Sequence, residues 1–191
     1  MEEIEHKKLT NLKLLTATKK MLPALEYICS TATNIDGFLC PGHVSVITGS
    51  DCFQKLCETY QKPFVVAGFE GEHILVAIVE ILKQIEANQA KVENCYTNAV
   101  SALGNEKAQK LIDHFFEARD GYWRGIGWIP DSEYVIRENF KCYCANLNIE
   151  IIEEEMPEGC QCAKVILGQI QPSQCPLFGT LCTPEDAIGP C

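Results

Sequence analysis

Dense apolar runs alternate with helically spaced apolar positions along most of the chain. Residues 63–68 read PFVVAG, a β-branched run that is typical of a buried parallel strand. Residues 72–87 follow with isoleucines at helical intervals, at Ile74, Ile78, Ile81 and Ile85. Further strands are predicted within residues 34–43 and 92–96, and further helices at residues 18–28, 52–60 and 105–119. This alternation predicts an α/β fold, a parallel sheet with helices on both faces.

The pattern weakens towards the C-terminus. Residues 121–130 (GYWRGIGWIP) read as a loop-rich connector, and short strands are predicted at residues 134–136 and 148–152. From residue 157 the chain is rich in Cys, Pro and Gly and poor in apolar periodicity. Such a segment buries too little apolar surface to order itself, so a metal or a covalent link is expected to supply what is missing. We therefore predict an α/β domain over residues 1–148 and a small Cys-rich appendix over residues 149–191.

Charge and hydropathy indicate which partners and which location to expect for this chain. Sixteen basic and 26 acidic residues give a formal net charge of −10, which disfavours nucleic acid as a partner. No apolar run approaches the roughly 18–20 residues that span a bilayer, so no membrane association is expected. The start, MEEIEHKK, lacks the apolar region of a secretory signal, and a cytoplasmic location is expected.

Twelve cysteines are present, and seven of them lie at or beyond Cys142. Thiols stay reduced in the cytosol, where clustered cysteines indicate metal or redox chemistry more often than disulfides. A C-x-C pair is followed by three cysteines at intervals of seven and nine: Cys160, Cys162, Cys175, Cys182 and Cys191. Thiolates suit iron–sulfur clusters or zinc, and these intervals do not match the C-x2-C knuckle of zinc ribbons. The tail is therefore predicted to bind a metal, with iron–sulfur favoured over zinc.

Three polar residues accompany predicted strand ends or loops. His43 follows one strand in CPGH, where it is a ligand, a proton carrier or a helix cap. Glu70 follows another strand in GFE, where it is a base or an acid favoured by a helix N-terminus. Arg124, between aromatic residues and glycines, is expected to pair with a backbone carbonyl or an acid rather than with a ligand.

These motifs together resemble the HypD family of [NiFe]-hydrogenase maturation factors. The matching segments occur in family order: FLCPGHVSVITG, FVVAGFE followed by HIL, GNEKAQ, WRGIG, GCQC and PSQCPLFGTLCTPEDAIGPC. The resemblance is to the C-terminal part of the family and runs from about residue 12 to residue 191. The last block is long and cysteine-phased, which makes the combination specific.

The resemblance implies an assembly scaffold with a redox role rather than a turnover enzyme. Family members build the Fe(CN)2CO group together with HypC, carry a [4Fe-4S] cluster, and have two α/β domains that flank a cleft. A HypC-like chaperone and a HypE-like cyanide donor are therefore the expected partners. By motif match, Cys175, Cys182 and Cys191 are cluster ligands, Cys160 and Cys162 are ligands or redox thiols, and His43 and Glu70 line the cleft.

The sequence also departs from the family pattern. The motifs C-G-T-H-E and G-P-G-C-P-V-C of the family's N-terminal half are absent, so that half is expected as a separate chain if the gene is split. In G-F-E-P-x-D-I-L, Gly71 replaces Pro and His73 replaces Asp, and Cys40 stands where no cysteine is expected. No role is assigned to Cys40, Cys142 or Cys144. A zinc-stabilised binding module, an inactive fragment and a thiol oxidoreductase using Cys160 and Cys162 are the alternatives.

Overall fold

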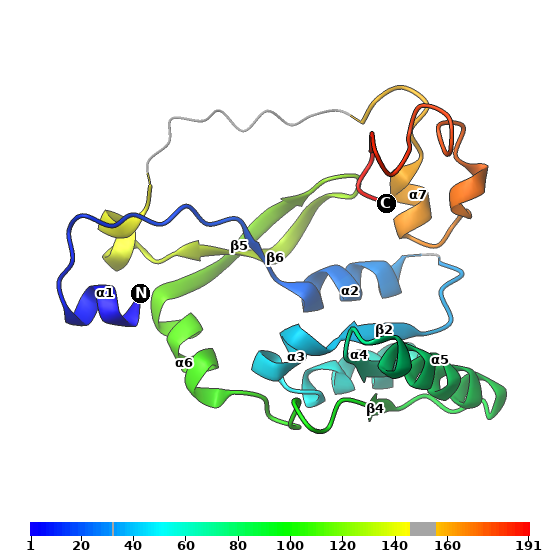
Figure 1. The fold of residues 1–191 in the computed structure, drawn as a ribbon, viewed down its shortest axis with the longest axis horizontal. Coiled ribbons are helices and arrows are strands. Elements are labelled where there is room, and N and C mark those ends of the chain that lie inside the picture. The colour runs from blue at the N-terminus through cyan, green and yellow to red at the C-terminus, as the bar shows by residue number, and fades with distance from the viewer. Residues whose placement is uncertain (32, 146–155) are drawn as a thin grey trace. The chain divides into compact units, whose positions relative to one another are not determined.

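The computed structural model describes residues 1–31, 33–145 and 156–191 of the chain, and these form two compact units (Figure 1). Unit 2 is one continuous stretch, Ile35–His114, whereas unit 1 combines Met1–Asn34 with Phe115–Cys191. The predicted boundary between residues 148 and 149, and the strand predicted at residues 148–152, lie outside the described residues.

Unit 2 is built on a parallel sheet in the strand order β2-β3-β4. Its strands are β2 (Phe38–Pro41), β3 (Phe64–Ala67) and β4 (Val92–Asn94). The first crossover contains α3 (Gly42–Thr48), the 3-10 helix η1 (Asp51–Phe53) and α4 (Gln54–Tyr60), and the second contains α5 (Gly71–Glu86). Helix α6 (Glu106–Phe115) follows β4. Both crossovers are the kind of connection that parallel strands require.

Helical elements contact both faces of β3, in keeping with its continuous apolar sequence. All four of its residues are buried. Val65 and Ala67 form a core cluster with Ala77 of α5. Phe64 points to the opposite face of the pleat and stacks on Phe53 of η1, with ring centroids 5.8 Å apart. The predicted parallel strand at residues 63–68 is confirmed.

Unit 1 holds a second, antiparallel sheet in the order β1-β6-β5. It consists of β1 (Thr18–Lys19), β5 (Phe116–Trp123) and β6 (Gly127–Ile136), and α2 (Met21–Ser30) contacts β6. The smaller elements of the unit are α1 (Glu2–His6), η2 (Glu138–Tyr143), α7 (Cys162–Ile166) and η3 (Pro172–Gln174). The chain is thus of mixed α/β class with a Cys-rich C-terminal region, but of the two sheets within the described residues only one is parallel.

The loop-rich connector predicted at residues 121–130 is wrong, because this segment forms the end of a β-hairpin. Its glycines serve the hairpin rather than interrupt it. A Cβ at Gly121 would lie 2.8 Å from the Cβ of Glu133 on the facing strand, so the strands approach closely there. Gly125 and Gly127 have φ angles of 82° and 106°, which the tight turn between β5 and β6 requires.

Two other elements differ from their predicted bounds. The helix expected over residues 105–119 ends at Phe115, where β5 begins. The helical spacing of apolar residues continues beyond Phe115, but Phe116 pairs with Ile136 of β6. Strand pairing therefore overrides the local helical pattern from residue 116 onwards. The helix expected to begin at residue 18 begins at Met21, because Thr18 and Lys19 pair with β6. In the described part of the chain, no helix combines the length and the apolar character that crossing a bilayer requires.

Candidate functional site

The end of the Cys-rich tail packs directly on two of its cysteines. Gly189 lies so close to them that an added Cβ would be 2.9 Å from the Cβ of Cys162. The same Cβ would lie 3.2 Å from the Sγ atoms of both Cys160 and Cys162. Any side chain at position 189 would therefore displace these sulfurs. The C-x-C pair and the final turn of the chain form one packed group.

A third thiol joins this group through a hydrogen bond between Cys162 and Cys191. Cys162 is almost fully buried. Burial first, and then this hydrogen bond, raises the pKa of the Cys162 thiol to about 12.

Cys175 lies in the opposite electrostatic environment. Its sulfur accepts hydrogen bonds from the backbone N–H groups of Gln161, Leu177 and Phe178, which lower its pKa. The Sγ of Cys182 accepts a hydrogen bond from the Ile188 N–H at 3.4 Å. N–H groups directed at sulfur stabilise thiolate, the form that ligates metal, and they also tune the potential of iron–sulfur clusters.

The turn between β5 and β6 holds the end of the tail in place. The guanidinium of Arg124 donates a hydrogen bond to the carbonyl oxygen of Ile188 at 3.0 Å. Next to it, a Cβ at Gly125 would lie 3.3 Å from Pro190 and 3.7 Å from the Sγ of Cys162. The expectation that Arg124 pairs with a backbone carbonyl is confirmed. The hairpin therefore supports the same thiol group from a distant part of the sequence.

The five predicted tail ligands do not all have the same surroundings. Cys160 and Cys162 lie against Gly189 and Cys191 hydrogen-bonds to Cys162, whereas Cys175 and Cys182 accept hydrogen bonds from backbone N–H groups of the tail. Among the described residues, no three His, Cys, Asp or Glu side chains are arranged to hold a metal ion. The donor set itself, thiols with N–H groups directed at sulfur, fits an iron–sulfur cluster.

The carboxyl ends of β2 and β3 form a separate site in unit 2. Gly42, the first residue of α3, allows the two strand ends to approach. A Cβ there would lie 2.4 Å from the carbonyl oxygen of Ala67 and 2.6 Å from the Tyr96 ring. A Cβ at Gly68 would similarly lie 2.4 Å from Nδ1 of His73. Glycine is needed at both positions, since any side chain would separate the loops that follow the strands.

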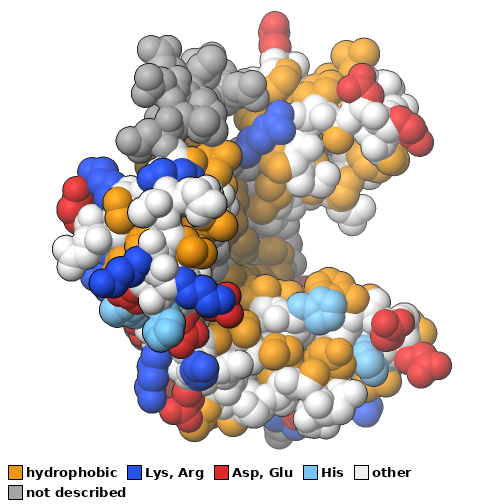
Figure 2. All heavy atoms as spheres, turned by 60° about the vertical axis from the view of Figure 1, so that its left-hand side comes forward, with side chains coloured by type: hydrophobic (Ala, Val, Ile, Leu, Met, Phe, Trp, Pro, Cys, Tyr) orange, Lys and Arg blue, Asp and Glu red, His pale blue; other side chains and the backbone are white. Residues whose placement is uncertain are grey.

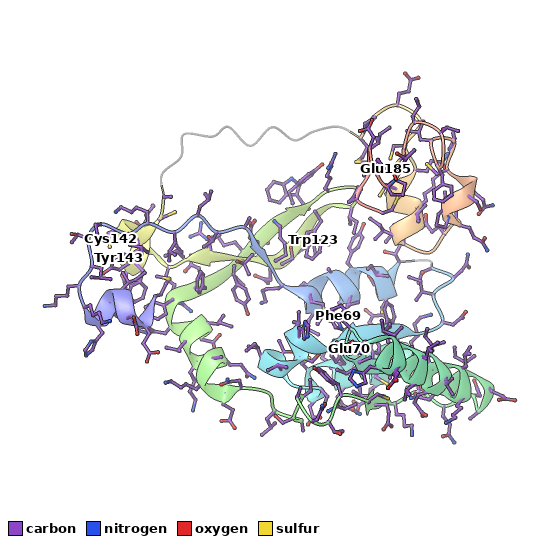
Figure 3. All side chains as sticks on the ribbon, viewed as in Figure 1. Phe69, Glu70, Trp123, Cys142, Tyr143 and Glu185 are labelled. Carbon is purple, nitrogen blue, oxygen red and sulfur yellow. The ribbon has the colours of Figure 1, made fainter. Side chains whose placement is uncertain are left out.

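His43, in α3, and Glu70, before α5, both follow these strand ends. The rings of His43 and Phe69 lie 4.7 Å apart between centroids. Figure 3 shows Phe69 and Glu70 side by side where α5 begins. Glu70 is the N-cap residue of α5, but its carboxylate makes no capping hydrogen bond. Its position at the N-terminus of α5 is one where the helix dipole stabilises a carboxylate. Because the carboxylate makes no capping hydrogen bond, a role as a base is compatible with the geometry as well.

A small apolar cavity of about 170 Å³ lies beside these residues. Its lining is Leu39, Cys40, Pro41, Ala67, Gly68, Phe69 and Ile74. Burial, and to a smaller extent the nearby Cys52, raises the pKa of the Cys40 thiol well above its ordinary value. Cys40 is therefore part of the cavity wall and stays protonated at neutral pH. Cys40 thus packs as a small buried side chain, apart from the cysteines of the tail.

Sequence reasoning missed three residues that shape these sites. Gly189 precedes a Pro-Cys pair and was not distinguished from other tail glycines. His73 and Tyr96 contact each other, with ring centroids 5.1 Å apart, although they lie on different elements. No periodicity or spacing links such residues, because their contact depends on the register of β3 and β4.

Comparison with known proteins places the whole chain among hydrogenase-related families. The family model described as "HypD: Hydrogenase formation hypA family" matches residues 1–191. A protein of Methanocaldococcus jannaschii named for hydrogenase expression and formation is 41% identical over 190 residues, 98% of this chain and 53% of the relative. The hydrogenase maturation factor HypD of Rhizobium leguminosarum bv. viciae is 38% identical over 82% of this chain and 42% of its own.

The HypD protein of Escherichia coli strain K12 is similarly 35% identical over 88% of this chain and 46% of its own length. The chain thus spans about half the length of the curated relatives it matches.

Proposed function

Because the chain belongs to the HypD family, we propose that it serves hydrogenase maturation as a scaffold that carries an iron–sulfur cluster in its tail. The observation that carries this proposal is the set of backbone N–H groups directed at the sulfurs of Cys175 and Cys182. Hydrogen bonds of this kind tune iron–sulfur clusters. Cys160 and Cys162 lie in the same tail, packed against Gly189, and Cys191 hydrogen-bonds to Cys162.

In this proposal Cys175, Cys182 and Cys191 ligate a [4Fe-4S] cluster, and Cys160 and Cys162 act as further ligands or redox thiols. The cluster, when bound, supplies single electrons. The chain's own contribution is to hold the sulfurs: Arg124 fixes the Ile188 carbonyl, and Gly189 leaves the space that the sulfurs occupy. A cytosolic location forms part of the proposal, since ligation requires reduced thiols.

The strand-end site of unit 2 is proposed to act on the iron group that is being assembled, the cargo of the scaffold. His43 presents an imidazole beside Phe69, and Glu70 presents a carboxylate without a capping partner. Imidazole can bind a metal or carry a proton, and a carboxylate can accept one. HypC-like and HypE-like proteins are the proposed partners that bring the components of this group.

Anaerobic reconstitution tests the cluster assignment. Incubation of the reduced protein with iron and sulfide is expected to give a broad absorption in the blue and stoichiometric acid-labile sulfide. Cys175→Ala and Cys182→Ala should each remove most of it, whereas Cys142→Ala, an exposed thiol outside the tail, should not. Unchanged absorption in both tail variants would show that the ligand assignment is wrong. Stoichiometric zinc without iron or sulfide would favour the binding-module alternative.

A second measurement addresses unit 2 separately. His43→Gln and Glu70→Gln are expected to leave the cluster absorption of the tail unchanged, because both residues belong to the other unit. Both should lower the iron that the protein retains beyond the cluster when it is isolated with its HypC-like partner. Glu72→Gln is the matched control, an acid in the first turn of the same helix. Equal iron retention in all three variants would remove His43 and Glu70 from the proposal.

A further inference from the structure

The segments that lead into the three strands of unit 2 border another cavity, of about 450 Å³. Asp36 precedes β2, Pro63 precedes β3 and Ala90 precedes β4, and all three line this cavity. Because the strands are parallel, the cavity lies at their amino ends, the edge of the sheet opposite to His43 and Glu70. Its volume falls in the range of about 300–1,000 Å³ that small-molecule sites occupy. A ligand held here would be separate from the strand-end site described above.

Gln84 is the buried polar residue of this cavity. It lies in the last turn of α5 and is only 3% exposed. Its Oε1 accepts a hydrogen bond from the Lys91 N–H at 3.0 Å, whereas its Nε2 has no hydrogen-bond partner among the described residues. A buried donor without an acceptor destabilises a protein, so such groups are rare in native structures. The cavity is the space that Gln84 lines, and a ligand there can supply the acceptor that Nε2 lacks.

The rest of the polar lining offers both donors and acceptors of hydrogen bonds. It includes one carboxylate, one phenol and three amides: Asp36, Tyr60, Gln61, Asn88 and Gln89. The side chains of Asp36, Asn88 and Gln89 are exposed, so a ligand can reach their polar groups. Each amide side chain holds a donor and an acceptor next to each other. The cavity therefore fits a ligand whose polar groups can both donate and accept.

Charge at the cavity disfavours an anion. The 16-residue helix α5 ends beside it, and the carbonyl groups at a helix C-terminus carry partial negative charge. Asp36 adds a full negative charge, while the Lys62 ammonium is engaged by the carbonyl oxygen of Ile35. Figure 2 shows basic side chains interspersed with acidic ones on the face that it draws, an arrangement in which the fields of the two signs offset each other. The free donor of Gln84 likewise disfavours a bare cation, so an uncharged ligand fits best.

We propose that this cavity binds a neutral polyhydroxylated molecule, of the class of sugars and polyols and of mono- to disaccharide size. A hydroxyl group donates and accepts at once. Neighbouring hydroxyls can therefore donate to the Asp36 carboxylate and accept from Nε2 of Gln84, while Asn88 binds a further pair. The Tyr60 ring offers an apolar surface with a polar tip, which suits the C–H face of a sugar ring. The proposal involves unit 2 alone and does not depend on the cluster in the tail.

Titration of the full chain with glucose, maltose and myo-inositol tests the proposal. Two-dimensional 1H–15N NMR follows the side-chain amide signals of Gln84, Asn88 and Gln89. At least one of the three probes is expected to shift the Gln84 signal along a saturable curve. Sodium acetate and sodium phosphate at matched ionic strength are the anion probes and should leave that signal in place. Shifts that only grow linearly with every sugar and polyol, or a saturable shift with either anion, overturn the proposal.

Variants of the lining make the test specific to this cavity. Asp36→Ala should weaken binding at least tenfold, and Glu86→Ala, an exposed acid of α5 outside the lining, should bind as the wild type does. Asn88→Gly should also weaken binding, and it should fold well because Asn88 has a φ of 49°. These two exposed lining positions keep the test decisive even if Gln84→Leu, expected to abolish binding, fails to fold. Equal affinity in Asp36→Ala, Asn88→Gly and the control overturns the proposal.

Iron and sulfide uptake by the tail should be unchanged in all of these variants, because every substituted residue belongs to unit 2. Failure of this cavity and failure of the cluster assignment are therefore distinguishable.

Discussion

Gly42 lies against the carbonyl oxygen of Ala67 so closely that a Cβ at position 42 would be 2.4 Å from that oxygen. The contact brings the end of β2 to the end of β3, next to His43 and Phe69. Because the obstructing atom belongs to the backbone, a rotamer change cannot relieve the clash. The parallel register of the two strands and the position of the site residues therefore depend on the same glycine.

Gly42→Ala is accordingly expected to destabilise the protein by on the order of 3 kcal/mol, the upper range for overpacking. Urea unfolding followed by circular dichroism measures this difference. The matched control is Gly71→Ala, since a Cβ at Gly71, the first residue of α5, meets nothing within 4 Å. It should be neutral or stabilising by about 0.5–1 kcal/mol. A stability loss of the same size in both variants would contradict the proposed backbone clash.

Gly189→Ala is expected to impair iron uptake more than it impairs folding. The added methyl would lie 3.2 Å from the Sγ atoms of Cys160 and Cys162 and so would move the thiol group. Reconstitution should give less than half of the wild-type acid-labile sulfide, with little change in far-ultraviolet circular dichroism. Ser173→Ala, an exposed change in η3, is the control and should reconstitute fully. Normal sulfide content in Gly189→Ala would show that the thiols tolerate displacement.

Arg124→Ala is expected to loosen the end of the tail, because the Ile188 carbonyl loses its guanidinium donor. Exchange of the amide hydrogens of Ile188, Gly189 and Cys191 should become faster, by roughly tenfold for a hydrogen bond worth about 1.4 kcal/mol. Arg119→Ala is the control, since that guanidinium pairs with Glu117 on the same strand. If the tail amides exchange at the same rate in the two variants, the hydrogen bond from the hairpin turn does not hold the end of the tail.

Cys40 is expected to make stability fall at alkaline pH. Its thiol ionises near its ordinary value of 9.0 in the unfolded chain, and only well above that value in the folded protein. Above pH 9 the unfolded state therefore releases a proton that the folded state retains. The free energy of unfolding should drop by up to about 1.4 kcal/mol per pH unit from this residue.

Urea unfolding at several values from pH 8 to pH 11 measures this slope. Cys40→Ala should flatten it, and Cys142→Ala, at an exposed position, should leave it as in the wild type. Cys52, Cys57 and Cys95 also have raised pKa values through burial, so part of the slope should persist in Cys40→Ala. An unaltered slope in Cys40→Ala would indicate that the cavity wall opens before the chain unfolds.

The predictable parts of the fold were those with one dominant signal. The PFVVAG run identified β3, and the spaced isoleucines identified α5 within one residue at each end. The β5–β6 hairpin was missed because its glycines look like loop formers. The role of Gly121 depends on the neighbouring strand, because a Cβ there would lie 2.8 Å from the Cβ of Glu133. Local sequence carries no information on such a partner.

The candidate site was predictable to a similar extent. Cysteine spacing marked the tail, and strand ends marked His43 and Glu70. The contacts of Cys160 and Cys162 with the end of the chain were not predictable, because they depend on how Gly189 and Cys191 fold back onto the C-x-C pair. For Arg124, a hydrogen bond to a backbone carbonyl was predictable. That the carbonyl belongs to Ile188, 64 residues away, was not.

The division of the chain into a continuous and a discontinuous unit has a consequence for its synthesis. Unit 2 occupies Ile35–His114 without interruption, so it can fold as soon as that stretch has left the ribosome. By contrast, β1 pairs with β6, whose residues are translated only after all of unit 2. The first 34 residues therefore cannot complete their fold until β6 has been synthesised, and unit 1 is completed last. A translational pause near residue 115 would consequently favour correct assembly, whereas premature release there would leave β1 and α2 without their sheet.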